Sequence, residues 1–229
     1  MPHPCLLYYI TDRKAFGGEE LGRRRQLLDK IAEATRAGVD RIQLREKDLS
    51  TRELESLARE AMSRIENLRA ENPALRTALL VNSRSDIAMA VQAHGVHLRS
   101  DDIHPWELRE IWSRVNRGNQ RGGARAPHPL IGVSCHSLAQ VANAAQEGAD
   151  FAVVAPVFEK KGAPNAIPRG LEWLREASRA SIPVLALGGV TLSNARACLE
   201  EGAAGIAAIR LFQENDIGAV ARALRESWQ

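Results

Sequence analysis

The chain has 229 residues, of which 45% are hydrophobic and 26% charged, the usual composition of a folded globular protein. Its 31 basic and 28 acidic residues are interspersed and only 4% of residues are aromatic, which argues against a nucleic-acid-binding surface. No run of 18 apolar residues could span a membrane and the N-terminus lacks a signal-peptide pattern, so we expect a cytoplasmic protein without a membrane partner.

Short apolar runs alternate along the chain with segments of 3.6-residue periodicity. The apolar runs predict strands at 6–10, 41–44, 78–81, 95–98, 130–134, 151–155, 183–187 and 205–209. The periodic segments predict helices at 19–37, 51–68, 85–93, 105–115, 138–147, 170–178, 193–200 and 215–227. Gly38, Gly148 and Gly202 follow three of these helices, where glycine can take the left-handed backbone that ends a helix.

Eight strand–helix units predict an α/β fold, a (β/α)₈ TIM barrel that forms a single domain over residues 1–229. The alternative is an open doubly wound sheet, which would normally carry a glycine-rich turn after its first strand. Residues 9–13 read YITDR instead, so the barrel is favoured. Residues 116–129 are rich in Gly, Arg and Pro and have no periodicity, which predicts a flexible surface insertion.

The active site of such a barrel forms at the C-terminal ends of its strands, where residues of equal parity share a direction. After the second strand, Gln43, Arg45 and Lys47 share parity and are expected in the barrel mouth. Two cations and an amide make a site for an anionic substrate, because arginine offers a fork for carboxylate or phosphate. A surface charge cluster with Glu46 is the alternative.

The third and fourth strands end in further polar residues, among them Asn82 and Arg99. Asp101 and Asp102 follow the fourth strand and could bind Mg²⁺, although Asp102 could equally cap the next helix.

The fifth strand ends with Ser134 and His136 facing the mouth and with Cys135 facing the helices. A histidine has a pKa near ~6.5, so His136 could both accept and donate a proton at neutral pH. Alternatively, Ser137 caps the next helix and His136 only packs beside it.

The last two strands end at Gly188-Gly189 and at Ile209-Arg210. Phosphate sites of barrels often form after strands seven and eight, where glycine lets backbone N–H groups approach an anion. The alternative is that the two glycines only form a turn. The combined pattern predicts a phosphorylated small molecule as ligand.

Eight segments carry a family resemblance, and in chain order they read YYITD, IQLREK, VNSRSDIA, GVHLRSDD, IGVSCHS, ADFAVVAPVFEKKG, VLALGGV and GAAGIAAIR. Together they resemble the thiamine phosphate synthase/TenI superfamily over nearly the whole chain apart from 116–129. The resemblance implies a barrel that binds thiazole phosphate and, in the synthase branch, a pyrimidine diphosphate with Mg²⁺.

The match to the synthase branch is incomplete. The resemblance gives Gln43, Arg45 and Lys47 the role of holding the diphosphate, and it makes Asp102 a Mg²⁺ ligand. Other positions depart from the synthase pattern: Ser83 replaces a metal-binding Asp after Asn82, Arg99 and Ser100 replace Gly and Gln, and Lys160 and Lys161 stand where two threonines are expected.

The TenI-like branch includes a thiazole tautomerase, whose catalytic histidine falls on His136 and whose proton transfer needs no metal. We therefore favour a tautomerase that acts on a carboxylated thiazole phosphate, with no cofactor and with Arg45 or Lys47 holding the carboxylate. A thiamine phosphate synthase with Mg²⁺ is the first alternative, and a silent phosphate-binding regulator is the second. The three cysteines have no metal-ligand spacing and fit a reducing compartment, and the sequence leaves a homodimer open.

Overall fold

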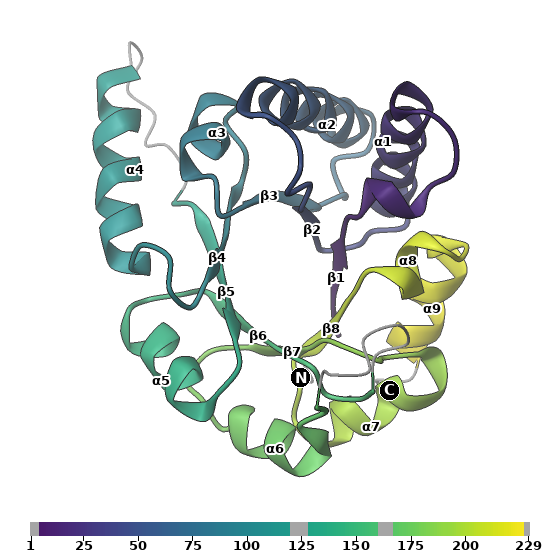
Figure 1. Cartoon of the computed structure of the whole chain (residues 1–229), viewed down its shortest axis with the longest axis vertical. Coiled ribbons are helices and arrows are strands. Elements are labelled where there is room, and N and C mark those ends of the chain that lie inside the picture. Colours follow the sequence, from purple (N-terminus) through teal and green to yellow (C-terminus); the bar gives the residue numbers. More distant parts are fainter. Residues whose placement is uncertain (1–4, 120–127, 160–166, 227–229) are drawn as a thin grey trace.

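The computed structural model describes residues 5–119, 128–159 and 167–226. Its sheet is a closed barrel in which eight parallel strands follow one another in chain order and β8 pairs with β1. The helices form a ring around the strands (Figure 1). The predicted single-domain TIM barrel is therefore confirmed.

The strands are β1 Leu6–Ile10, β2 Arg41–Leu44, β3 Ala78–Asn82, β4 Gly95–Arg99, β5 Leu130–Cys135, β6 Phe151–Val154, β7 Val184–Ala186 and β8 Gly205–Ala208. The helices are η1 Arg13–Ala15, α1 Glu20–Arg36, α2 Thr51–Glu71, α3 Ser85–Ala90, α4 Pro105–Asn119, α5 Leu138–Gln146, α6 Gly170–Ala177, α7 Leu192–Glu200, α8 Arg210–Gln213 and α9 Ile217–Glu226. None of the described helices has the length and apolar character that a membrane span requires.

The helix ends follow the glycine rule inferred from the sequence. Gly38, Gly148 and Gly202 have φ angles of 70°, 81° and 89°, the left-handed backbone that closes a helix. Helix α4 continues to Asn119 and so takes up the first four residues of the segment predicted as an insertion. Residues 120–127 of that segment lie outside the described part of the chain, so the expected flexibility stays a prediction.

The strands separate two apolar layers. Alternate strand residues point outward against the helices, and Cys135 belongs to this outer layer as predicted. The inward side chains fill the barrel, with Tyr8 and Phe151 in edge-to-face contact at 5.3 Å. Gly132 makes room for this pair, because a Cβ at that position would overlap the Phe151 ring. The barrel is therefore packed solid below its mouth.

Candidate active site

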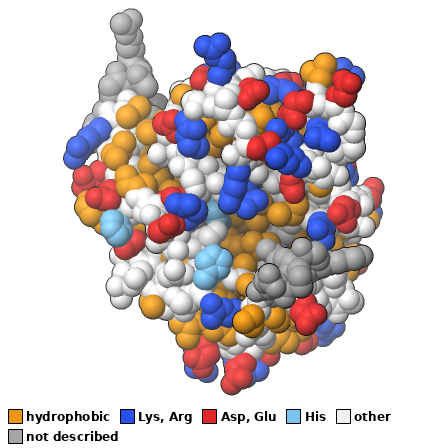
Figure 2. Space-filling model, in the orientation of Figure 1, with side chains coloured by type: hydrophobic (Ala, Val, Ile, Leu, Met, Phe, Trp, Pro, Cys, Tyr) orange, Lys and Arg blue, Asp and Glu red, His pale blue; other side chains and the backbone are white. Residues whose placement is uncertain are grey.

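Three basic side chains gather at the C-terminal end of the barrel: Arg45 and Lys47 after β2, and Arg99 at the end of β4. Lys47 is exposed, and its pKa is lowered mainly by the charge of Arg45, then by burial and by Arg99. The half-buried Arg45 guanidinium makes no hydrogen bond or ion pair within the described residues. Lys and Arg side chains accordingly border the centre of the face seen in Figure 2. The expected basic mouth is present.

Two amide side chains lie beside the cations. Gln43 is buried on the inward side of β2, and its Nε2 donates to Oδ1 of Asn82 at 2.7 Å. Asn82 in turn donates from Nδ2 to Oγ of Ser83 at 3.3 Å. Strand parity predicted that Gln43 faces the mouth, and the structure brings it into contact with Asn82 at the end of β3.

Asp102 completes this chain of hydrogen bonds. Its Oδ2 accepts from the Ser83 hydroxyl at 2.8 Å and from the Arg99 backbone N–H at 2.8 Å, and its Oδ1 lies 3.2 Å from Nε of Arg99. The alternative that Asp102 caps the next helix is wrong, because the loop before α4 directs this carboxylate to Ser83 and Arg99. Asp101 also pairs with Arg99, at 3.2 Å.

The donor chemistry at Asp102 does not fit a Mg²⁺ site built by the protein. Mg²⁺ is usually bound through one or two carboxylates together with substrate phosphates. Both oxygens of Asp102 are occupied by protein donors, one of them a guanidinium. In the described part of the chain no group of three or more His, Cys, Asp or Glu could hold a metal.

A buried polar relay that the sequence analysis did not single out lies inside the barrel. His97 is 2% exposed, with Nδ1 3.0 Å from the Tyr8 hydroxyl and Nε2 2.8 Å from Oγ of Ser134. Burial first, and the charge of Arg45 second, lower the pKa of His97 to about 3. His97 is therefore neutral at physiological pH, and it ties the mouth residue Ser134 to β1. The signal was the inward parity of His97, two residues before Arg99.

His136 lies at the same end of the barrel, on the exposed loop after β5. Its Nδ1 is 3.0 Å from the carbonyl oxygen of Ala155. A carbonyl only accepts hydrogen bonds, so Nδ1 carries the hydrogen and Nε2 of the neutral ring keeps its lone pair. Ser137 caps α5 by accepting from the Gln140 N–H at 3.2 Å, so that part of the alternative interpretation is confirmed.

The paired glycines pack against the loop after β6. Gly188 and Gly189 have φ angles of 96° and 69°, and a Cβ on Gly188 would lie 2.8 Å from Cα of Pro156. Their carbonyls accept from Phe158 N–H and from Asn194, whereas their own N–H groups have no acceptor within the described residues. His136 and Gly188 thus contact the neighbouring residues Ala155 and Pro156. The histidine and the glycines therefore lie at one pole of the barrel.

The other predicted residues are less informative. Ile209 leads from β8 into α8, and Arg210 is exposed with Nε 3.7 Å from Glu214. Lys160 lies outside the described residues, so its expected role in substrate binding stays a prediction.

The fold and this arrangement define a (β/α)₈ barrel with a basic mouth. Residues 7–212 match the family model described as thiamine monophosphate synthase, and the chain belongs to that family. The resemblance found in the sequence is thereby confirmed at the level of the superfamily.

Named relatives cover nearly the whole chain. A protein of Aquifex aeolicus, named "Putative thiamine-phosphate synthase 2", is 41% identical over 91% of this chain and 97% of its own length. A thiamine-phosphate synthase of Syntrophomonas wolfei is 34% identical over 97% of this chain and 96% of its own length. The solved thiamine phosphate pyrophosphorylase of Pyrococcus furiosus superposes with a TM-score of 0.75 at 29% identity, covering 99% of this chain and 96% of that one.

These relatives place the chain among the enzymes of thiamine biosynthesis. The names of these three relatives support the synthase alternative better than the tautomerase that the sequence analysis favoured.

Proposed function

We propose that this protein is a thiamine phosphate synthase, which joins hydroxymethylpyrimidine diphosphate to thiazole phosphate and releases pyrophosphate. In this reaction the bond between the pyrimidine methylene carbon and the diphosphate oxygen breaks. A new bond forms between that carbon and the thiazole nitrogen. The negative charge that develops on the departing diphosphate is the charge that the protein must stabilise.

The observation that carries this proposal is the basic mouth. Arg45 and Lys47 offer a guanidinium and an ammonium that no carboxylate neutralises within the described residues, and Arg99 lies close enough to lower the pKa of Lys47. Three neighbouring cations suit a ligand with several negative charges better than a single carboxylate.

The remaining mouth residues divide between the two substrates. Gln43 and Asn82 lie directly beneath the cations and would position the diphosphate end of the pyrimidine substrate. The N–H groups of Gly188 and Gly189, which have no acceptor within the described residues, would bind the phosphate of the thiazole. His136 is an exposed residue at the same end of the barrel.

The test is an assay of the purified protein with both substrates in the presence of Mg²⁺, with pyrophosphate and thiamine phosphate as the measured products. Arg45→Gln and Lys47→Gln should each lower kcat/KM by about 100-fold, as expected for loss of a charged donor to the leaving group. Arg59→Gln is the matched control, because Arg59 is an exposed residue of α2 that pairs with Glu55.

The same preparation is given carboxylated thiazole phosphate alone. Aromatisation of this compound, combined with no pyrophosphate release from the substrate pair, would contradict the synthase and support the tautomerase. A rate of that aromatisation unchanged by His136→Ala would in turn remove His136 from the tautomerase mechanism.

A further inference from the structure

Three carboxylates converge on one buried arginine beside the basic mouth. Arg13 is 3% exposed, and its guanidinium lies 2.6 Å from Glu20, 3.3 Å from Glu46 and 2.7 Å from Asp48. A second nitrogen of the same guanidinium donates to Asp48 at 2.9 Å, so this pair is bidentate. We refer to Arg13, Glu20, Glu46 and Asp48 as the Arg13 cluster.

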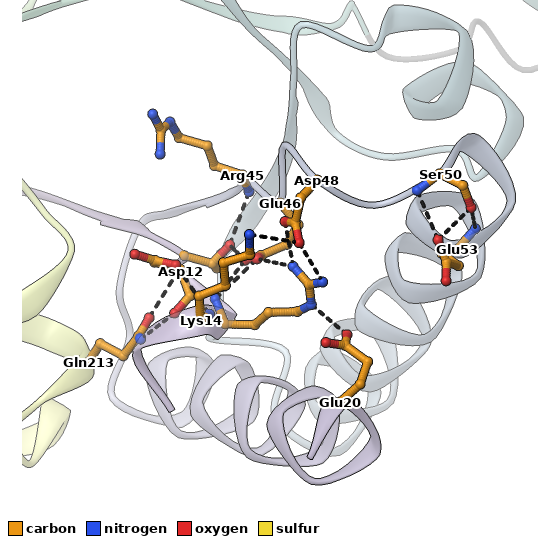
Figure 3. Close-up of polar contacts among 11 residues, drawn as sticks. Asp12, Lys14, Glu20, Arg45, Glu46, Asp48, Ser50, Glu53 and Gln213 are labelled. Atoms are coloured by element: carbon orange, nitrogen blue, oxygen red, sulfur yellow. Dashed lines mark hydrogen bonds and ion pairs between the residues drawn. The ribbon is translucent and has the colours of Figure 1, made fainter. Parts of the chain in front are cut away.

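The Arg13 cluster is interleaved with the proposed diphosphate-binding residues. Glu46 and Asp48 alternate in the chain with Arg45 and Lys47. The Thr11 hydroxyl connects the two sets, because it donates to Glu46 at 2.6 Å and accepts from the Arg45 backbone N–H at 3.0 Å. Figure 3 shows the carboxylates of Glu46 and Asp48 gathered on one side of the loop and the Arg45 side chain extending away from them.

In the loop after β2, the carboxylates and the cations are therefore held apart. Asp48 is held ionised by Arg13, whose hydrogen bonds are the main cause of its lowered pKa. Lys47, the neighbouring residue, has a pKa lowered by cations and by burial, and no carboxylate is among the causes. Within the described residues Asp48 pairs with Arg13 and Lys14, and not with the preceding Lys47.

We propose that Arg13 is a positioning residue that sequesters the carboxylates of the loop after β2, so that Arg45 and Lys47 stay available for an incoming diphosphate. The identity of that ligand rests on the proposed function. In a chain without the Arg13 guanidinium, Glu46 would still be held by Thr11 and by the Arg13 backbone N–H at 3.1 Å. Asp48 would lose both hydrogen bonds from the guanidinium and keep its ion pair with the exposed Lys14 ammonium at 3.1 Å, so it is the carboxylate that would turn to the cations.

The test measures binding of inorganic pyrophosphate by calorimetry to the full-length wild type, Arg13→Gln, Asp48→Asn and the double variant Arg13→Gln/Asp48→Asn. Arg13→Gln should weaken binding by about tenfold, because a released carboxylate then competes for the cations. Asp48→Asn in the Arg13→Gln background should recover most of that loss. Asp48→Asn alone should bind pyrophosphate at least as tightly as the wild type does, and the control Arg59→Gln should bind it with the affinity of the wild type.

A second measurement reports on Lys47 itself. The pH dependence of its acylation, followed by mass spectrometry of the peptide that contains it, gives its pKa in each variant. Arg13→Gln should raise this pKa and the double variant should lower it again, because a nearby carboxylate favours the charged amine. A general loosening of the loop would not reverse in this way.

The outcomes separate the two proposals. A wild type that does not bind pyrophosphate would overturn the proposed function and this inference with it. A wild type that binds, together with an unaffected Arg13→Gln, would overturn this inference alone, as would a double variant as weak as Arg13→Gln. Should Arg13→Gln fail to fold by circular dichroism, Arg13→Lys with and without Asp48→Asn provides the same comparison.

Discussion

His97 shows how a single side chain changes character when the barrel closes around it. In the unfolded chain its imidazole titrates near 6.5, whereas in the barrel it is enclosed by Tyr8, Phe151 and Ser134. Water cannot solvate an imidazolium there, and Arg45 repels it further, so the pKa falls to about 3. The neutral ring offers one donor and one acceptor nitrogen to the hydroxyls of Tyr8 and Ser134. A protonated ring would donate from both nitrogens, so both hydroxyls could only accept from it.

This shift predicts a stability cost in acid. Between pH 6.5 and 3 the unfolded chain binds a proton at His97 that the folded chain does not, so stability falls as the pH falls through this window. At pH 5 the loss should be on the order of 2 kcal/mol relative to pH 8. Urea unfolding of the wild type and of His97→Gln at both pH values measures it, with the variant losing less. Equal pH dependence in the two proteins would show that His97 titrates normally.

The direction of a single side chain can be predicted from the sequence where strand parity determines it. Its contact partners cannot, because they depend on how the strands and loops pack. Parity alone placed Gln43 and Ser134 at the mouth, because alternation is a property of every strand. It also pointed His97 inward but could not show that Tyr8 would meet it from another strand. The ion pair of Arg13 with Asp48 was not predicted for the same reason, since it joins the loops after β1 and β2, two strands that pair side by side.

At the scale of elements, the turn after β7 illustrates why glycine is needed at one position more than at another. Gly188→Ala adds a Cβ at 2.8 Å from Cα of Pro156 on a left-handed backbone, whereas Gly148→Ala has the same kind of backbone and open space. Gly148→Ala should cost about 1 kcal/mol of unfolding free energy, and Gly188→Ala about 1–3 kcal/mol more because of overpacking.

The comparison of these two variants separates backbone strain from crowding. Thermal unfolding supplies the stability difference, and the KM for thiazole phosphate supplies a functional one, which should rise in Gly188→Ala only. An equal loss of stability in Gly148→Ala and Gly188→Ala would mean that the loop after β6 moves to accommodate the new Cβ at little energetic cost.

Strands marked by an apolar run were predictable, and single helical turns were not. Strands β1 and β2 begin and end as expected, because an apolar run bounded by polar residues marks a buried strand. Helices η1 and α8 span three and four residues, too few for a 3.6-residue period to show. Strand β7 spans Val184–Ala186 rather than 183–187, and Leu187 still donates its N–H to the Val154 carbonyl at 3.0 Å before the chain turns through Gly188.

At the scale of the whole molecule, the first and last strand–helix units are connected by side-chain hydrogen bonds as well as by the pairing of β1 with β8. Gln213 of α8 is buried, and its Oε1 accepts from the Tyr9 hydroxyl at 2.9 Å and from the Asp12 N–H at 3.1 Å. Its Nε2 donates to the Asp12 carbonyl at 2.6 Å. These three hydrogen bonds connect residues more than 200 positions apart, at the seam where β8 meets β1.

Gln213→Ala should therefore weaken the closure of the barrel as a whole. The variant leaves the buried Tyr9 hydroxyl and the Asp12 backbone groups without partners, which should lower the free energy of unfolding by about 2–4 kcal/mol. Tyr9→Phe removes the hydroxyl that donates to Gln213, so no buried donor is left without an acceptor, and it should lower the free energy of unfolding by about 1 kcal/mol. Asn215→Ala is the control, since Asn215 is exposed nearby. Urea unfolding should give a lower midpoint with an unchanged slope, because the barrel still unfolds as one unit. A reduced slope would instead mean that the seam opens before the rest of the barrel.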